Sequence, residues 1–178
     1  LRTLPFPKHL RHFVRPVLAR SKTDHQFVGR LRCGCSGMTF RLLFPGKTHK
    51  FQGRLTPVTT KVGGAYFFLI RAQCERCGRE HLVFDQDLHG WNGFVCHNEA
   101  QASLPRAPLS PWRCLRCGEE RHRGLVTVTS QGRTDFVEEA GPDFKPSQWA
   151  EGFESLSLEL VCRGCSLQTS PWVACEAM

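Results

Sequence analysis

The sequence predicts a mostly β protein with two tandem zinc-stapled antiparallel β units behind a basic N-terminal arm. Three observations predict this fold class. Eight of the ten cysteines fall in four close pairs, an apolar stretch leading into Cys-x-x-Cys occurs twice, at residues 66–78 and 154–165, and apolar residues alternate in both copies. Alternation with period two is typical of a strand with one buried face. The aligned apolar residues are Phe68, Ile70 and Ala72 in the first copy and Leu156, Leu158 and Leu160 in the second.

The close cysteine pairs favour metal binding over disulfide bonds. Two thiols that are one or two residues apart on a tight turn point the same way, which suits two ligands of a tetrahedral ion and strains a disulfide between them. Units of about 70 residues have little apolar core, whereas a structural zinc ion adds about 10 kcal/mol to folding. We therefore expect two structural Zn²⁺ ions per chain.

Alignment of the two copies indicates which cysteines share an ion. Pairing within each copy is favoured, and pairing across the copies is the alternative. Two cysteines are left over, Cys96 and Cys175; they are small buried thiols or, alternatively, a replacement ligand or a reactive nucleophile. The expected ligand sets are Cys33, Cys35, Cys74 and Cys77 for one ion and Cys114, Cys117, Cys162 and Cys165 for the other.

Charge and composition suggest where the chain divides. Residues 1–32 carry eight Lys or Arg against one acid, whereas the remainder has 16 basic and 15 acidic residues. The arm could be a basic helix over His9 to Arg15, a phosphate-contacting tail, an Arg-rich targeting peptide or a loosely ordered terminus. Three prolines and small residues mark a linker between the units. The expected divisions are a basic N-terminal arm (1–28), a first zinc-binding β unit (29–98), a Pro-rich linker (99–111) and a second zinc-binding β unit (112–178).

Each unit is expected to run from a cysteine pair through a β meander and a long strand to a second pair. In the first unit, β-branched and aromatic residues predict strands within 56–73, and EHLVFD predicts a short strand over Glu80–Asp85. In the second unit, strands are expected over Leu125–Ser130, before Cys162 and at the C-terminal end. An acidic, aromatic excursion over 135–154 separates them, and it includes one short helical turn near Ser147.

The segment Asp85–Asn98 departs from the strand pattern and is the candidate functional loop. Its candidate residues are Asp85, Asp87, His89, Trp91, Cys96 and His97. If the chain is extended there, the first three share one face and could bind a catalytic metal. The alternative is that both aspartates hydrogen-bond the turn and that His89 is exposed. The tryptophans, with Trp112, Trp149 and Trp172, could line a groove or pack in the core.

The paired cysteines, 40 to 50 residues apart in a β setting, resemble the β-tent and Mss4-like zinc-binding group. That group includes the Yippee and cereblon drug-binding domains and the methionine sulfoxide reductase B fold. The segment GRLRCGCSGMTF, residues 29–40, is similar to the opening of glutathione-dependent formaldehyde-activating enzymes. The phrase CGREHLVFDQDLHGWNGFVC, residues 77–96, resembles uncharacterised bacterial proteins with duplicated zinc-ribbon-like halves. These resemblances imply a zinc-ribbon or β-tent-like fold.

Two classes of function follow from these patterns. The first is a zinc-binding interaction module with a protein partner, together with nucleic-acid contact through the basic residues of 1–32. The alternative is a metal- or thiol-dependent enzyme that uses the Asp85–His97 loop. No stretch of about 18 apolar residues predicts a membrane span, and metal-held thiolates suit a reducing cytoplasm.

Overall fold

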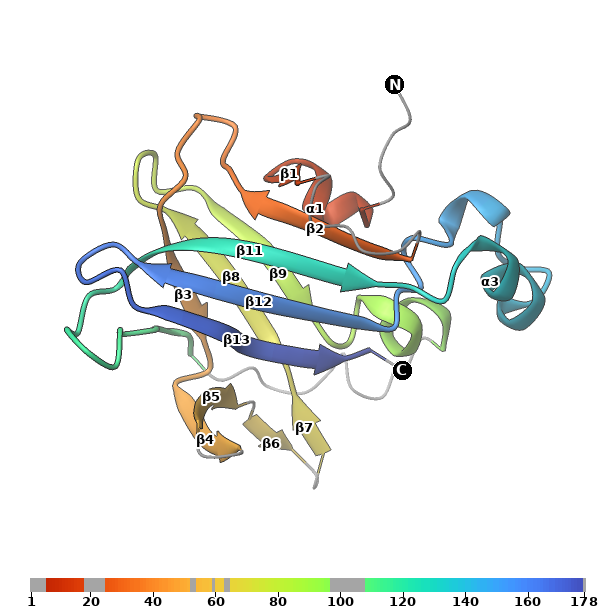
Figure 1. Cartoon of the computed structure of the whole chain (residues 1–178). Coiled ribbons are helices and arrows are strands. Elements are labelled where there is room, and N and C mark those ends of the chain that lie inside the picture. The colour runs from red at the N-terminus through yellow and green to blue at the C-terminus, as the bar shows by residue number, and fades with distance from the viewer. Residues whose placement is uncertain are drawn as a thin grey trace.

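Antiparallel strands make up most of the structure, a computed structural model that describes residues 6–17, 25–51, 54–58, 60–62, 65–96 and 108–177 (Figure 1). The strands are β1 (Val14–Pro16), β2 (Gln26–Leu31), β3 (Phe40–Phe44), β4 (Lys47–Phe51), β5 (Arg54–Val58), β6 (Thr60–Val62), β7 (Ala65–Phe67), β8 (Leu69–Cys74), β9 (Glu80–Asp85), β10 (Ser110–Pro111), β11 (Arg121–Thr129), β12 (Ser155–Cys162) and β13 (Gln168–Glu176). The helical elements are α1 (Lys8–Arg11), the π-helix η2 (Trp91–Val95), α3 (Arg133–Ala140) and the 3₁₀ helix η3 (Pro146–Gln148).

Nine of these strands form one curled sheet that resembles half a barrel (Figure 1). Along its main path the order is β1-β2-β11-β3-β8-β9; β12 and β13 extend it from β11, and β10 pairs with β3. Two small hairpins, β4-β5 and β6-β7, lie apart from this sheet. Every pairing is antiparallel, so the mostly β prediction is confirmed.

Strands from the two expected units join in this one sheet. We call residues 25–96 the first half and residues 108–177 the second half. Strand β2 of the first half pairs along β11 of the second, and β10 of the second half pairs with β3 of the first. Each half therefore donates the strand before its first cysteine pair to the other half. Strand β10 also lies within the expected linker, whose residues 99–107 are outside the described residues.

The pairing registers of the two halves match. Phe40 of β3 lies opposite Cys74 of β8, and His122 of β11 lies opposite Cys162 of β12. Phe40 and His122 also lie opposite each other, where the two halves meet. Both outer hairpins, β8-β9 and β12-β13, show a register irregularity at corresponding positions. The two halves thus meet at positions that have the same register relative to their own cysteines, Phe40 in the first half and His122 in the second.

The N-terminal segment, residues 6–17, is part of the folded body. A helix over His9 to Arg15 was one alternative for the arm; the structure has a shorter helix, Lys8–Arg11, and the chain then forms β1 against β2. Phe6, Leu10 and Phe13 are almost fully buried, which explains why this segment packs despite its basic residues. The remaining arm residues, 1–5 and 18–24, lie outside the described residues.

One apolar core collects side chains from both halves and from the N-terminal segment. In β11 and β12 buried positions alternate with half-buried or exposed ones, so one face of the sheet packs and the other is nearer to solvent. The largest fully buried side chains are Trp172, Phe13, Phe40, Phe84, Phe136, Phe153, Leu10, Leu31, Leu42, Ile70, Leu156 and Leu158.

Several expected elements have the predicted bounds and others differ. Strand β9 is Glu80–Asp85, as predicted, and a helical turn, η3, includes Ser147. The excursion also overlaps a helix that was not predicted, α3, which lies between Gly132 and Gly141 and buries Phe136. No helix in the described ranges is both long and apolar enough to cross a membrane.

Candidate metal centres

The first centre brings together the cysteines of two connections between strands. Cys33 and Cys35 lie between β2 and β3, and Cys74 and Cys77 lie at the end of β8 and the start of its turn to β9. All four sulfur atoms lie within 4.8 Å of one another. The Sγ atoms of Cys33 and Cys77 are 3.6 Å apart, as are those of Cys35 and Cys74.

The second centre is built in the same way from the second half. Cys114 and Cys117 precede β11, Cys162 is the last residue of β12, and Cys165 lies in the turn between β12 and β13. These four sulfur atoms also lie within 4.8 Å of one another. The Sγ atoms of Cys114 and Cys165 are 3.6 Å apart, and those of Cys117 and Cys162 are 3.5 Å apart. The cysteines therefore group within each half, as the alignment of the two copies predicts.

The sulfur spacing fits one tetrahedral metal ion in each group. A zinc–sulfur bond of about 2.3 Å in a tetrahedron places neighbouring sulfur atoms about 3.8 Å apart. A disulfide would require about 2.05 Å, which is much shorter than any of the four distances given above. The donor set and the geometry of both groups thus fit a closed four-thiolate shell.

Backbone hydrogen bonds shape the turns that carry the cysteines. The N–H of Gly78 donates to the carbonyl of Cys74 at 2.9 Å, and the N–H of Gly118 donates to that of Cys114 at 2.9 Å. Each of these glycines has a positive φ, which suits a residue without Cβ. In the other two turns a serine, Ser36 or Ser166, has the positive φ instead.

Gly37 leaves space beside the first centre that a side chain would fill. A Cβ at this position would lie 2.7 Å from the Sγ of Cys74 and 3.3 Å from that of Cys35. Across the same centre, Arg76 Nη1 donates to the carbonyl of Cys35 at 2.9 Å. The small Gly37 lets the two cysteine turns of the first centre approach closely, and the Arg76 hydrogen bond connects them.

The thiols of the first centre differ in acidity because their surroundings differ. Hydrogen bonding by the backbone of Gly37 lowers the pKa of the Cys35 thiol to about 7, whereas burial raises the pKa of Cys74 to about 12. A four-thiolate shell around a divalent cation has a formal charge of −2, so nearby cations favour it. Exposed arginines flank the cysteines in the sequence: Arg32, Arg76, Arg79, Arg116 and Arg163.

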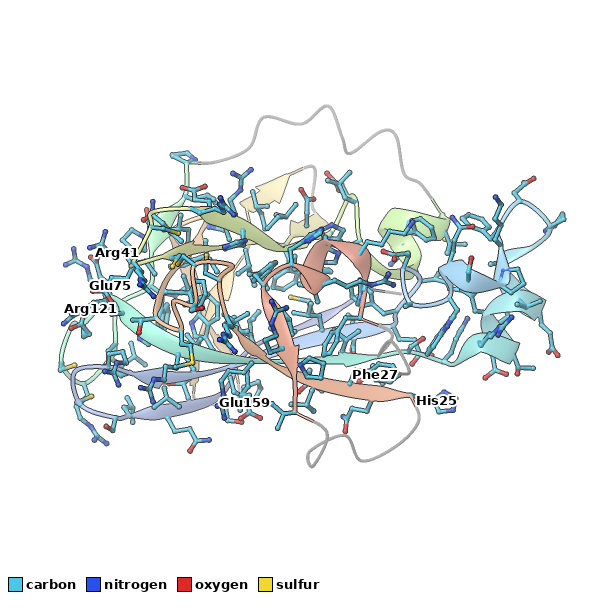
Figure 2. All side chains as sticks on the ribbon, turned by 90° about the horizontal axis from the view of Figure 1, so that it is seen from above. His25, Phe27, Arg41, Glu75, Arg121 and Glu159 are labelled. Atoms are coloured by element: carbon cyan, nitrogen blue, oxygen red, sulfur yellow. The ribbon has the colours of Figure 1, made fainter. Side chains whose placement is uncertain are left out.

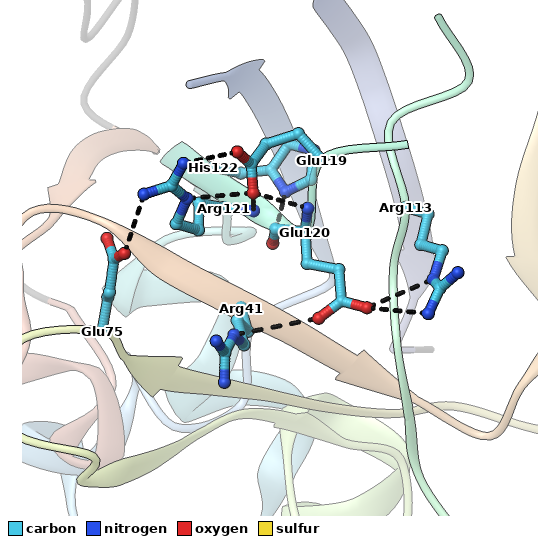
Figure 3. A network of polar contacts seen from close by, with 7 residues as sticks. All are labelled: Arg41, Glu75, Arg113, Glu119, Glu120, Arg121 and His122. Carbon is cyan, nitrogen blue, oxygen red and sulfur yellow. Dashed lines mark hydrogen bonds and ion pairs between the residues drawn. The ribbon is translucent and has the colours of Figure 1, made fainter. Parts of the chain in front are cut away.

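A polar network links the two centres (Figure 3). Arg121 donates to Glu75, in the turn of the first centre, at 3.1 Å, and to Glu119, which follows the second centre's first turn, at 2.6 Å. Glu120 similarly joins Arg41 of β3 to Arg113 beside Cys114. Figure 2 shows Arg41, Glu75 and Arg121 gathered at one end of the molecule, well away from His25.

The candidate functional loop begins with a tightly bonded turn. Asp85 and Asp87 are buried; Asp85 Oδ1 accepts from the N–H of Asp87 at 3.1 Å, and the N–H of Asp85 donates to His89 Nδ1 at 3.0 Å. Only Asp85 belongs to a strand, so the three side chains do not share a strand face. Within the ranges that the structure describes, the two four-cysteine groups are the only clusters that could hold a metal ion.

His89 is mostly buried, not exposed as the turn alternative supposed. Its ring stacks on His9 of α1, with ring centroids 3.6 Å apart and planes 6° apart. His9 Nε2 lies 3.1 Å from the carbonyl oxygen of Val83. Burial lowers the pKa of His9 to about 3 and that of His89 to about 4, so both rings are neutral near pH 7. Sequence reasoning missed this pair because its members are 80 positions apart.

The other predicted loop and aromatic residues have different surroundings. Trp91 opens η2 and contacts the edge of Phe136, while Cys96 is exposed after η2 and His97 lies outside the described residues. Cys175 is buried, and burial raises the pKa of its thiol. Trp112 and Trp172 pack edge to face in the core, and Trp149 packs on Phe27, so these three do not line a shared groove.

A shallow hollow of about 240 Å³ lies on the solvent face of the sheet. Its residues come from β2, β11, β12, β13 and the turn that follows Cys35. In register, Leu125 of β11 lies between Arg30 of β2 and Glu159 of β12. The lining residues are Arg30, Met38, Arg123, Gly124, Leu125, Glu159, Val161 and Gln168.

Comparison of the chain with protein-family models, with curated proteins and with solved structures gave no match.

Proposed function

We propose that the protein binds two zinc ions, one in each four-cysteine group, and that both ions are structural. The observation that carries this proposal is the convergence of four sulfur atoms within 4.8 Å in each group. Four thiolates complete the tetrahedral shell of zinc and leave no open position for a substrate or water. Each ion would tie together two turns that are 39 or more residues apart along the chain.

We also infer that the two halves are copies of one zinc-ribbon or β-tent-like unit. The matched registers of β3-β8-β9 and β11-β12-β13 support this inference. So does the exchange of strands between the halves, in which β2 pairs with β11 and β10 pairs with β3. In this interpretation both copies kept two close cysteine pairs and the strand order, although the first pair is Cys-x-Cys in one copy and Cys-x-x-Cys in the other. Metal-held thiolates require a reducing compartment, so the cytoplasm is the proposed location.

The proposed cellular role is that of an interaction module with a protein partner. Support comes from large apolar side chains beside the metal centres: Met38 is 42 % exposed and Leu115 is 58 % exposed. Met38 also borders the hollow, whose apolar Leu125 and Val161 are flanked by Arg30 and Arg123. Glu159 also lines the hollow, so the charged rim holds two arginines and one glutamate. An apolar floor with this mainly basic rim suits a segment that carries one apolar side chain beside acidic residues.

Elemental analysis of protein purified without added metal tests the zinc proposal. The expected content is two zinc ions per chain, with eight thiols protected from alkylation until a chelator is added. Replacing the exposed Cys96 by Ser is the matched control and should leave both ions in place. Metal-free protein whose clustered cysteines are oxidised would overturn the proposal.

Site-specific photo-cross-linking in cells tests the partner proposal. A photoreactive residue at Met38 should capture a partner, and Leu125→Glu should abolish capture. The matched control has the photoreactive residue at Thr127, which lies on the same strand as Leu125 and is outside the hollow. Equal capture at both positions, or capture that Leu125→Glu leaves unchanged, would place any partner elsewhere.

Nucleic-acid contact through residues 1–32 remains part of the proposal. Deleting the whole arm would also remove buried Phe6, Leu10 and Phe13, so the test neutralises exposed charge instead. Arg15→Gln with Arg32→Gln should weaken binding of a fluorescent single-stranded oligonucleotide and reduce its salt dependence. If the double variant binds the oligonucleotide as tightly as the wild type does, these two arginines do not contact nucleic acid.

A further inference from the structure

The two metal centres have similar sulfur geometry but different neighbours. His81 Nε2 lies 3.3 Å from the Sγ of Cys33 in the first centre. In the second half, the position that corresponds to His81 is Thr169, because His81 pairs with Ala72 as Thr169 pairs with Leu160. In the second centre the N–H of Gly164 lies 3.3 Å from the Sγ of Cys162, so a backbone group contacts that thiolate.

Aromatic packing fixes the position of the His81 ring. The ring stacks on Phe13 with centroids 4.6 Å apart and planes 22° apart, and it meets Phe40 nearly edge to face at 6.2 Å. Phe13 and Phe40 are fully buried, so the ring has little room to turn away from Cys33. The carbonyl of Phe13 also accepts from the N–H of Arg32, the residue before Cys33, at 2.7 Å.

The chemistry of a metal-bound cysteine decides the direction of this contact. A thiolate bound to a cation has no proton, so it can only accept a hydrogen bond. His81 must then donate from Nε2. A hydrogen bond of this kind withdraws electron density from the sulfur, orients it and makes it less reactive toward electrophiles.

We propose that His81 is a positioning residue for the first metal centre, where it donates Nε2–H to the Cys33 thiolate and makes this centre slower than the second to release its ion. This inference rests on the proposed metal binding. It predicts two centres of unequal reactivity within one chain, despite their matched strand registers. It also makes the N-terminal segment, through Phe13, part of the support for one centre only.

Loading the full chain with ¹¹³Cd gives a readout for each centre. The wild type should show two cadmium resonances in the range of four-sulfur coordination, and a chelator should remove the two ions at different rates. His81→Phe retains an aromatic ring for stacking and removes the N–H. This variant should shift one resonance and speed release of that ion about tenfold.

Two further variants separate positioning from packing. His81→Gln has an N–H donor at a similar distance from the backbone and should restore most of the wild-type shift and slow release. Thr169→Val is the matched control in the second half and should change neither resonance. Resonances and release rates that His81→Phe leaves unchanged would overturn the role of His81.

The design distinguishes failure of this inference from failure of the proposed metal binding. Absence of both cadmium resonances in the wild type would overturn the metal proposal itself. Two resonances with equal release rates would overturn only the inequality of the centres. If His81→Phe does not fold, the wild-type rates and the Gln variant still decide: equal wild-type rates, or a Gln variant that releases the first-centre ion as fast as the second centre releases its own, would overturn the inference.

Discussion

Arg121 lies directly opposite Arg41 across the junction of β11 and β3. Like charges in this arrangement repel, because facing side chains of an antiparallel pair are close together. Glutamates flank both arginines: Glu75 and Glu119 bind Arg121, and Glu120 binds Arg41 (Figure 3). Hydrogen bonding and charge from the glutamates raise the pKa of Arg121, so it stays charged. The glutamates thus offset the repulsion between the two arginines, and the resulting ion pairs connect the two metal centres.

Arg121→Gln is expected to lower the melting temperature at low ionic strength. The variant removes the cation that Glu75 and Glu119 share, and Glu119 has its pKa lowered to about 2 chiefly by hydrogen bonding to Arg121. Because these groups are exposed, salt should screen the effect. Thermal melts at low and high salt measure it, with Arg123→Gln on the same strand as control. A melting difference that persists in high salt would contradict the electrostatic explanation.

Cys77→Ser should reduce zinc content from two ions to one and lower the free energy of unfolding by about 4 kcal/mol or more. The loss of stability should also reach the second half, because β2 leads directly into Cys33 of the first centre and pairs along β11. Zinc analysis and amide exchange around Val126 and Val128 measure both effects. If amide exchange becomes faster only in the first half of the variant, the two halves are stable independently.

Acid should destabilise the protein through His9 and His89. Both pKa values are lowered by burial, to about 3 and about 4, while an unfolded imidazole titrates near pH 6.5. The unfolded chain therefore binds more protons below pH 6.5, and stability falls as pH drops from there toward pH 4. Each ring contributes at most about 1.4 kcal/mol per pH unit.

Neighbouring charges modify this acid sensitivity but do not reverse it. Asp85 raises the pKa of His89, though burial outweighs this effect. Near His9, Glu151 accepts from the N–H of Lys8 and pairs with Arg11. Comparing denaturant unfolding of wild type and His89→Phe between pH 7 and pH 5 isolates the contribution of His89. His12→Gln, at an exposed position, is the control; an equal pH slope in wild type and His89→Phe would exclude His89.

Asp85→Ala is expected to lower the free energy of unfolding by about 1–3 kcal/mol, because the buried N–H of Asp87 would lose its acceptor. Asp143→Ala, at an exposed position, should cost little. Chemical denaturation of the two variants measures the difference. If Asp85→Ala keeps wild-type stability yet loses an activity found for the protein, the side chain serves function rather than the turn.

Each close cysteine pair could be predicted from sequence because its geometry is local, and the alignment of the two copies then indicated which pairs share an ion. Two cysteines on one short turn, as in Cys74 and Cys77, converge whatever the rest of the chain does. The bounds of β9 were predictable for a similar reason, since Glu80–Asp85 contains a short run of strand-favouring apolar residues and is bounded by turn residues. The pattern of each strand indicates its own face, but it does not indicate which strand will be its partner.

The features that sequence reasoning missed depend on distant partners. Nothing in the sequence near Gly29 indicates that β2 will pair with β11. In the N-terminal segment, Lys8 and Arg11 suggest a solvated arm, yet the apolar Phe6, Leu10 and Phe13 decide its packing. Hydrophobic burial of three large side chains outweighs a few surface charges that remain exposed.

The pairing of β2 with β11, a strand of the other half, also implies an order of events during synthesis. Strand β2 leaves the ribosome on the order of ten seconds before β11, its long partner, at about 5–20 residues per second. All four cysteines of the first centre are made within that interval. Zinc binding would therefore tie the nascent β2–β3 and β8–β9 connections together while one edge of β2 is still unpaired. An ion bound there would hold the first half together until β11 is made and pairs with the open edge of β2.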